Sequence, residues 1–88
     1  MTVLVTQDLP GVTDADYAGL VSELGSKLAE APGFISHAAG PVDGGWRVNE
    51  LWESKEAHSA WYSGHVVPIM PGGAPPTPVV VYQITNMI

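Results

Sequence analysis

The sequence of 88 residues predicts a single α+β domain whose elements follow the order strand, helix, strand, strand, helix, strand. Two observations carry this prediction. Four runs rich in β-branched or aromatic residues are bounded by turn residues, and two other segments repeat apolar residues every three or four positions. A chain this short forms one domain, 1–88, and buries only roughly 60 to 65% of its unfolded surface, so association into a dimer would add stability.

The first half of the chain alternates strand, helix and strand. Residues 2–7 are mostly β-branched and alternate, which indicates a strand that turn residues at 8–11 should end. Thr13 is suited to cap the next helix, because its hydroxyl can accept from a free N–H group of the first turn. Helical spacing continues to about Ala31, where a Pro-Gly pair stops the helix, and residues 34–39 predict the second strand.

The second half begins with a predicted hairpin. Residues 40–45 are turn-forming, and residues 46–52 alternate in the manner of a strand. Ser54 is a good N-cap for a helix that begins at about Lys55 and should break near Gly64. The sequence therefore predicts an uninterrupted passage from strand to helix in this region.

The C-terminal part adds the last strand. Four prolines within 71–78 exclude regular structure there, whereas the apolar run 79–85 indicates a strand buried on both faces. The order βαββαβ is that of the ferredoxin-like fold, a four-stranded antiparallel sheet with both helices on one face. A strand buried on both faces then needs a partner for the uncovered face, and a second copy would complete a barrel-like homodimer.

The composition excludes several classes of function. Three basic residues against nine acidic ones give a net charge of −6, which repels nucleic acid and anionic membrane surfaces. No apolar run reaches the roughly 18 residues of a membrane helix, and the first residues lack the basic start of a signal peptide, so we expect a cytoplasmic protein. No metal site is expected, because cysteine is absent and His58 and His65 are too far apart for the usual pair of ligands.

The candidate catalytic residues are His58 and Glu50. Strand alternation puts Glu50 on one face with Trp46 and Trp52, and helical spacing puts His58 on the stripe that faces the sheet. If these two faces meet, the carboxylate and the imidazole form a proton-transfer dyad. The alternatives are a structural histidine and a carboxylate that reaches solvent.

The aromatic and histidine side chains near this pair are candidates for substrate binding. Trp52 and Trp61 would wall a flat aromatic pocket, and both also suit a core. His65 lies near the end of the helix, where it complements the negative end of the dipole, and His37 faces either the helices or the dimer interface. The residues expected to contact a substrate are Trp52, Trp61, Tyr62, His65, Tyr17 and His37.

Five short motifs between residues 32 and 57 match a known family, and the likeness covers nearly the whole chain. They are Pro32-Gly33-Phe34, Ala39-Gly40-Pro41, Gly45-Trp46-Arg47-Val48, Trp52-Glu53-Ser54 and Glu56-Ala57. The pattern resembles the small antibiotic biosynthesis monooxygenase-like (ABM-like) proteins of the dimeric α+β barrel superfamily. The resemblance implies the fold and a homodimer. For activity it implies a range that includes cofactor-free oxygenases, haem-degrading enzymes, isomerases and cyclases.

Two departures from the family pattern bear on the activity. Family oxygenases that act on tricyclic phenols pair a strand Asn with a Trp four residues later; Trp52 matches this Trp, but Val48 stands at the Asn position and Asn49 is one residue off. Haem-degrading members carry a helix Trp, matched here by Trp61, and an axial His ten residues later, where this chain has Pro71. The resemblance therefore implies no haem ligation of that kind, and no cofactor is expected.

The sequence supports three hypotheses about function. The first is a cofactor-independent monooxygenase for a flat hydrophobic aromatic or polyketide-like molecule, in which His58 or Glu50 removes a phenolic proton and the electron-rich anion itself reduces O₂. The second is a cyclase, isomerase or dehydratase that uses the same two residues as acid and base. The third is a non-catalytic ligand-binding protein in which the aromatic stripe is packing.

Overall fold

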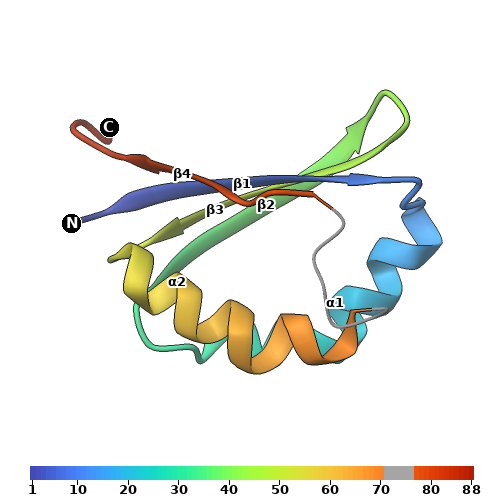
Figure 1. Ribbon diagram of the computed structural model, residues 1–88, viewed down its shortest axis with the longest axis horizontal. Coiled ribbons are helices and arrows are strands. Elements are labelled where there is room, and N and C mark those ends of the chain that lie inside the picture. Colours follow the sequence, from blue (N-terminus) through green and yellow to red (C-terminus); the bar gives the residue numbers. More distant parts are fainter. Residues whose placement is uncertain (71–76) are drawn as a thin grey trace.

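The computed structural model describes residues 1–70 and 77–88. A four-stranded antiparallel sheet with the order β2-β3-β1-β4 forms one layer, and the helices lie against one face of it (Figure 1). The predicted ferredoxin-like α+β arrangement is therefore confirmed. The elements are β1 (Val3–Pro10), α1 (Asp14–Ala29), β2 (Phe34–Val42), β3 (Gly45–Trp52), α2 (Lys55–Trp61), the π-helix η1 (Tyr62–Val66), the 3-10 helix η2 (Val67–Ile69) and β4 (Val80–Gln83).

Both α-helices begin at a residue whose side chain caps the first helical turn. The side chain of Thr13 accepts from the backbone N–H of Asp16 at 3.2 Å, and the Asp16 carboxylate accepts from the backbone N–H of Thr13 at 3.1 Å. This reciprocal pair satisfies two donors that the first turn of α1 leaves free. At α2, the Ser54 hydroxyl accepts from the N–H of Ala57 at 3.1 Å. Both predicted N-caps are confirmed.

Three predicted boundaries were wrong, and pairing with β3 explains the first two. β1 continues through Pro10, which pairs with Gly45, because β4 covers only residues 3–6 of β1 and the missing N–H of proline is not needed on that side. β2 extends to Val42, so the hairpin turn shrinks to two residues, of which Gly44 adopts a φ of 77°.

The third wrong boundary is the helix break expected at Gly64. The chain stays helical there, passing from α2 into η1 and then into η2. Glycine in a helix costs about 1 kcal/mol but removes no backbone donor, so it weakens a helix without ending it. The result is a continuous helical segment that spans the sheet (Figure 1).

The hydrophobic core lies between the sheet and α2. Trp52 is fully buried, and Val3, Val5 and Trp61 pack around it. On β3, side chains alternate as predicted, and the structure shows that the face with Glu50, which is 7% exposed, is the one that meets the helices. The core therefore closes around a strand that carries both an indole and a carboxylate.

Gly33 permits the close approach of α2 to the start of β2. Its φ is 83°, in the left-handed region that favours glycine, and a Cβ atom there would lie 2.6 Å from the Cβ of Ala57. Its carbonyl accepts from the N–H of Glu53 at 2.8 Å. This glycine fixes the position of α2 against the sheet.

β4 differs in length and burial from the strand that the sequence predicted at residues 79–85. It has four residues, and all are exposed, including Val80 at 42% and Tyr82 at 54%, so the predicted burial on both faces is wrong for the single chain. The physical reason is that β4 is an edge strand, hydrogen-bonded only to β1, and no described helix covers the outer face of the sheet (Figure 1). The segment predicted to be irregular lies mostly at 71–76, outside the described residues. Within the described ranges, no helix is long and apolar enough to cross a membrane.

Candidate functional site

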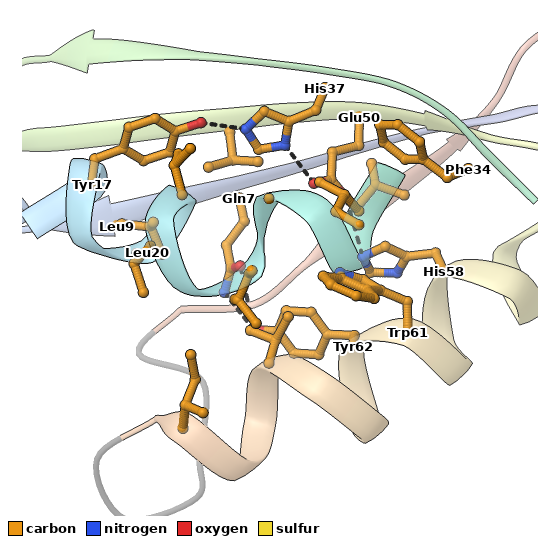
Figure 2. Close-up of a pocket in the computed structure, with 18 of the residues that line it drawn as sticks. Gln7, Leu9, Tyr17, Leu20, Phe34, His37, Glu50, His58, Trp61 and Tyr62 are labelled. Carbon is orange, nitrogen blue, oxygen red and sulfur yellow. Dashed lines mark hydrogen bonds and ion pairs between the residues drawn. The ribbon is translucent and has the colours of Figure 1, made fainter. Parts of the chain in front are cut away.

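A cavity of about 470 Å³ lies between the sheet and the helices. Most of its wall is apolar, with leucine and valine side chains from α1 on one side. Figure 2 shows polar side chains that enter it from the sheet, from α1 and from the α2 segment. The polar residues that line it are Gln7, Tyr17, His37, Glu50, His58 and Tyr62.

Glu50 lies in the middle of the largest polar cluster of this cavity. Its Oε2 lies 2.6 Å from Nδ1 of His37, and its Oε1 accepts from the indole N–H of Trp52 at 2.9 Å. A buried carboxylate is tolerated only when its oxygens are hydrogen-bonded, and both oxygens of Glu50 are. The strand register produces this arrangement, because His37 on β2 pairs directly with Glu50 on β3.

Tyr17 extends the cluster to α1. Its hydroxyl contacts Nε2 of His37, and burial and the charge of Glu50 raise the pKa of Tyr17, which keeps the phenol protonated. An indole N–H can only donate, so Glu50 acts as the acceptor. The consistent assignment has the Tyr17 hydroxyl donate to Nε2 of His37, and the Nδ1–H of His37 donate to Glu50. Both nitrogens of His37 are therefore occupied.

His58 approaches the same carboxylate from α2 without a direct hydrogen bond. Its Nε2 lies 4.0 Å from Oε1 of Glu50, and its ring meets Trp52 edge-on with centroids 5.6 Å apart. Burial lowers the pKa of His58, partly offset by the charge of Glu50, so the imidazole is neutral at pH 7. The two faces meet as the predicted dyad requires, and Glu50 also has two hydrogen-bonded partners that were not predicted, His37 and Trp52 (Figure 2).

A second polar pair lies elsewhere in the cavity wall. The amide of Gln7 donates to the hydroxyl of Tyr62 at 3.0 Å and to the carbonyl of Thr77 at 3.1 Å. Burial raises the pKa of Tyr62, and the hydrogen bond with Gln7 opposes this. Sequence reasoning missed Gln7. The available signal was its alternation on β1 with the buried residues Val3 and Val5.

The structure separates the other expected substrate contacts. Trp61 and Tyr62 line the cavity with Tyr17 and His37. Trp52 does not, because it is fully buried behind Glu50. His65 does not either; it stacks on Trp61, with centroids 4.7 Å apart, and lines a separate outer groove. The expected roles of Trp52 and His65 as substrate contacts are thus not supported by their positions.

The sequence matches no model of a known protein family and no curated protein. In three dimensions the chain is similar to the haem-degrading protein MhuD of Mycobacterium tuberculosis in a haem-free, cleaved form, with a TM-score of 0.63 and 21% identity over 100% of this chain and 99% of that chain. The same protein with two haems in its active site gives a TM-score of 0.59 and 19% identity over 100% and 99% of the two chains.

A monooxygenase of Streptomyces coelicolor, ActVA-Orf6, in complex with nanaomycin D gives a TM-score of 0.58 and 25% identity over 99% of this chain and 88% of that chain. These neighbours are ABM-fold proteins, so the predicted ABM-like resemblance is confirmed as a likeness of fold along the whole chain. Identity at this level does not carry an activity from one chain to another.

The groups that line the cavity do not fit haem. Haem propionates are anions, yet none of the three basic residues of the chain lines the cavity, and Glu50 puts a carboxylate in its wall. Both nitrogens of His37 are occupied, and Nε2 of His58 faces Glu50. Pro71, at the position of the family's axial ligand, lies outside the described residues. Among residues 1–70 and 77–88, no three His, Asp or Glu side chains are grouped to hold a metal ion.

Proposed function

We propose that this chain is a small-molecule enzyme that binds a flat, hydrophobic aromatic or polyketide-like molecule and oxidises it as a cofactor-independent monooxygenase. The observation that carries the proposal is an apolar cavity of about 470 Å³ with the buried carboxylate of Glu50 and the imidazole of His58 facing each other in its wall. Enzyme and ligand sites combine apolar surface with a few converging polar groups in this way. The likeness in fold to a monooxygenase supports the same reading.

In the proposed reaction, Glu50 is the base. The hydroxyl of a phenolic substrate donates to Oε1 of Glu50, which has a second lone pair beside the bond from Trp52. His58, with its proton on Nε2, donates to the same substrate oxygen and stabilises the phenolate as it forms. His37, held by Tyr17, keeps the Glu50 side chain in position.

The phenolate then supplies the electrons that reduce O₂. For an anthrone, one atom of O₂ becomes the new carbonyl oxygen, the methylene carbon loses both hydrogens, and the second oxygen atom leaves as water. The cavity contributes orientation and exclusion of bulk water. Trp61 and Tyr62 form the wall against which the flat ring system would lie.

Oxygen uptake over anthrones, naphthols and hydroquinones, with a metal chelator present, tests this proposal. The wild type should exceed the uncatalysed rate, and His58→Ala or Glu50→Gln should lower kcat/KM by roughly 10² to 10³, the typical effect of losing an anion-stabilising donor or a base. His65→Ala is the matched control, since it removes an imidazole from the same helical segment but outside the cavity. Uptake no faster than the uncatalysed rate across the panel contradicts the proposal.

The hydrogen-bonded series Tyr17, His37 and Glu50 favours one alternative function. Such a series can move a proton without any oxidant, which suits a cyclase, isomerase or dehydratase. Turnover of a carbonyl substrate under nitrogen, lost in Glu50→Gln, would select this alternative. Saturable binding of aromatic molecules without turnover, in air or under nitrogen, would select a non-catalytic ligand-binding protein.

We also propose that the chain forms a homodimer through the outer face of the sheet. Val80 and Tyr82 are exposed there, and they pair with Thr6 and Leu4 of β1, so apolar side chains of two strands meet on a face that no described helix covers. Such a patch marks an interaction surface. Light scattering should give a dimer mass for the wild type and a monomer mass for Tyr82→Glu; a monomeric wild type contradicts the dimer.

A further inference from the structure

Two polar atoms face each other across a gap in the cavity wall. Oε1 of Glu50 and Nε2 of His58 are 4.0 Å apart, which is too long for a hydrogen bond between them. An oxygen or nitrogen atom about 2.8 Å from both would fit between them and bond to each. Figure 2 marks this contact, between Glu50 on the sheet and His58 on the α2 segment, with a dashed line.

The surrounding groups define what can occupy that position. Glu50 already accepts from Trp52 and His37, and its remaining capacity on Oε1 is for one more donor. A hydroxyl can donate to Oε1 while it accepts from Nε2–H, and an amino group can donate to Oε1 and, in the other imidazole tautomer, to Nε2 as well. An ionised carboxylate only accepts hydrogen bonds and has no hydrogen to offer Glu50.

The charges around the cavity also favour a neutral or cationic substituent at this position. None of the three basic residues compensates an anion there, because Arg47 is paired with Asp8 at 2.6 Å on the surface, Lys27 lines the outer groove, and Lys55 is exposed at the start of α2. Like charges a few ångströms apart in a partly buried site repel strongly. An anionic substituent beside Glu50 therefore carries a penalty that a neutral or cationic substituent does not.

We propose that the position between Oε1 of Glu50 and Nε2 of His58 is a donor subsite, which selects aromatic ligands with a hydroxyl or amino group and rejects their carboxylate analogues. The inference rests on the proposed function to the extent that both use the same cavity. It adds the class of ligand: neutral or cationic hydrogen-bond donors on a flat apolar ring system.

Calorimetric titration with four probes, 2-naphthol, 2-naphthylmethylamine, 2-naphthoate and unsubstituted naphthalene, tests the subsite. At neutral pH, 2-naphthol and 2-naphthylmethylamine should bind the wild type at least about tenfold more tightly than 2-naphthoate, as expected for a nearby uncompensated carboxylate. Glu50→Gln should reduce this preference to about threefold or less, because the amide removes the repulsion. Glu23→Gln, which removes the same charge from an exposed site on α1, should leave the preference unchanged.

A second variant keeps the test valid if Glu50→Gln does not fold. His58→Phe preserves an aromatic ring and should reduce the advantage of 2-naphthol over unsubstituted naphthalene while naphthalene itself still binds. The subsite is overturned if 2-naphthoate binds the wild type within threefold of 2-naphthol, or if a folded Glu50→Gln keeps the full preference.

The same probes separate the subsite from the proposed function. Selective binding of hydroxyl and amino probes without any oxygen uptake would support the subsite and contradict the monooxygenase. Oxygen uptake by a protein that binds 2-naphthoate as tightly as 2-naphthol would do the reverse.

Discussion

The two helices contact the same face of the sheet in different ways. α1 has 16 residues and buries none of them, whereas α2 has seven and buries two, His58 and Trp61. Under α2 the space is filled by Trp52, whose ring meets Phe34 edge-on at 5.4 Å. Under α1 the apolar stripe lines the cavity. The difference teaches that an amphipathic helix can turn its apolar stripe toward a ligand site, and it predicts that more of the stability comes from the contacts of the other helix.

The largest test of this division is Trp52→Ala. Removing a fully buried indole should lower the free energy of unfolding by about 3 to 5 kcal/mol, because the loss of burial adds to the cavity left behind. Urea denaturation measures the effect, and Trp52→Phe should cost less because it leaves a smaller cavity. A cost of about 1 kcal/mol or less for Trp52→Ala would show that the α2 side does not dominate stability.

A pair of glycines compares a close contact of α2, at Gly33, with an exposed position of α1, at Gly19. Gly33→Ala should destabilise the protein by roughly 1 to 3 kcal/mol, because the new Cβ would meet Ala57 and the residue has a positive φ. Gly19→Ala on α1 meets nothing within 4 Å and should be neutral or stabilising by about 0.5 to 1 kcal/mol. Thermal and urea unfolding measure both. Equal effects of the two substitutions would contradict the contrast.

Acidification probes the α2 side through His58. Its pKa is below the ordinary value of 6.5, chiefly because it is buried. Between 6.5 and the lowered value, the unfolded chain binds a proton that the folded chain does not, so stability falls as the pH falls through this window. Above pH 6.5 the imidazole is neutral in both the folded and the unfolded chain, so this loss of stability is absent.

His58→Phe should lose less stability than the wild type between about pH 7 and about pH 5, since it has no imidazole to protonate. Urea unfolding at several pH values measures the difference, with His65→Phe as the exposed control. Identical pH dependence in wild type and His58→Phe would show that the imidazole does not carry this loss.

The smallest effect on stability is expected on the α1 side. Leu20 is half-buried and lines the cavity, so Leu20→Ala should cost about 1 kcal/mol or less. The same substitution should weaken binding of 2-naphthol, because it removes apolar wall. A cost as large as that of Trp52→Ala would mean that α1 packs as tightly as α2.

The sequence predicted the parts of the fold that depend on local chemistry. Thr13 and Ser54 cap their helices as expected, since a hydroxyl beside free N–H groups acts without tertiary help. The expected ends of the first strand at residue 7 and of the second helix near Gly64 were wrong, because strand pairing and helix continuation override local breakers. Boundaries set by distant partners are not visible in a local pattern.

The candidate site likewise combines features that a local pattern predicts with features that depend on a distant partner. Alternation on β3 grouped Glu50 with Trp46 and Trp52 but left open which face meets the helices, and the partner His37 was not predictable, because β2 shifts register between Phe34 and Ser36. This irregularity breaks strict alternation and turns His37 toward Glu50. Gln7 was missed because the strand pattern around it was interpreted through its apolar members.

The strand order also has a kinetic consequence. β1 is synthesised early yet lies between β3 and β4, and its residue Val3 pairs with Gln83. One edge of β1 therefore stays open until nearly all of the described chain has left the ribosome. Long-range pairing is slow, and an open edge invites pairing with the wrong chain. The nascent chain consequently exposes residues 3–6 of this edge to mispairing until β4 covers them, at a stage when the rest of the sheet is already in place.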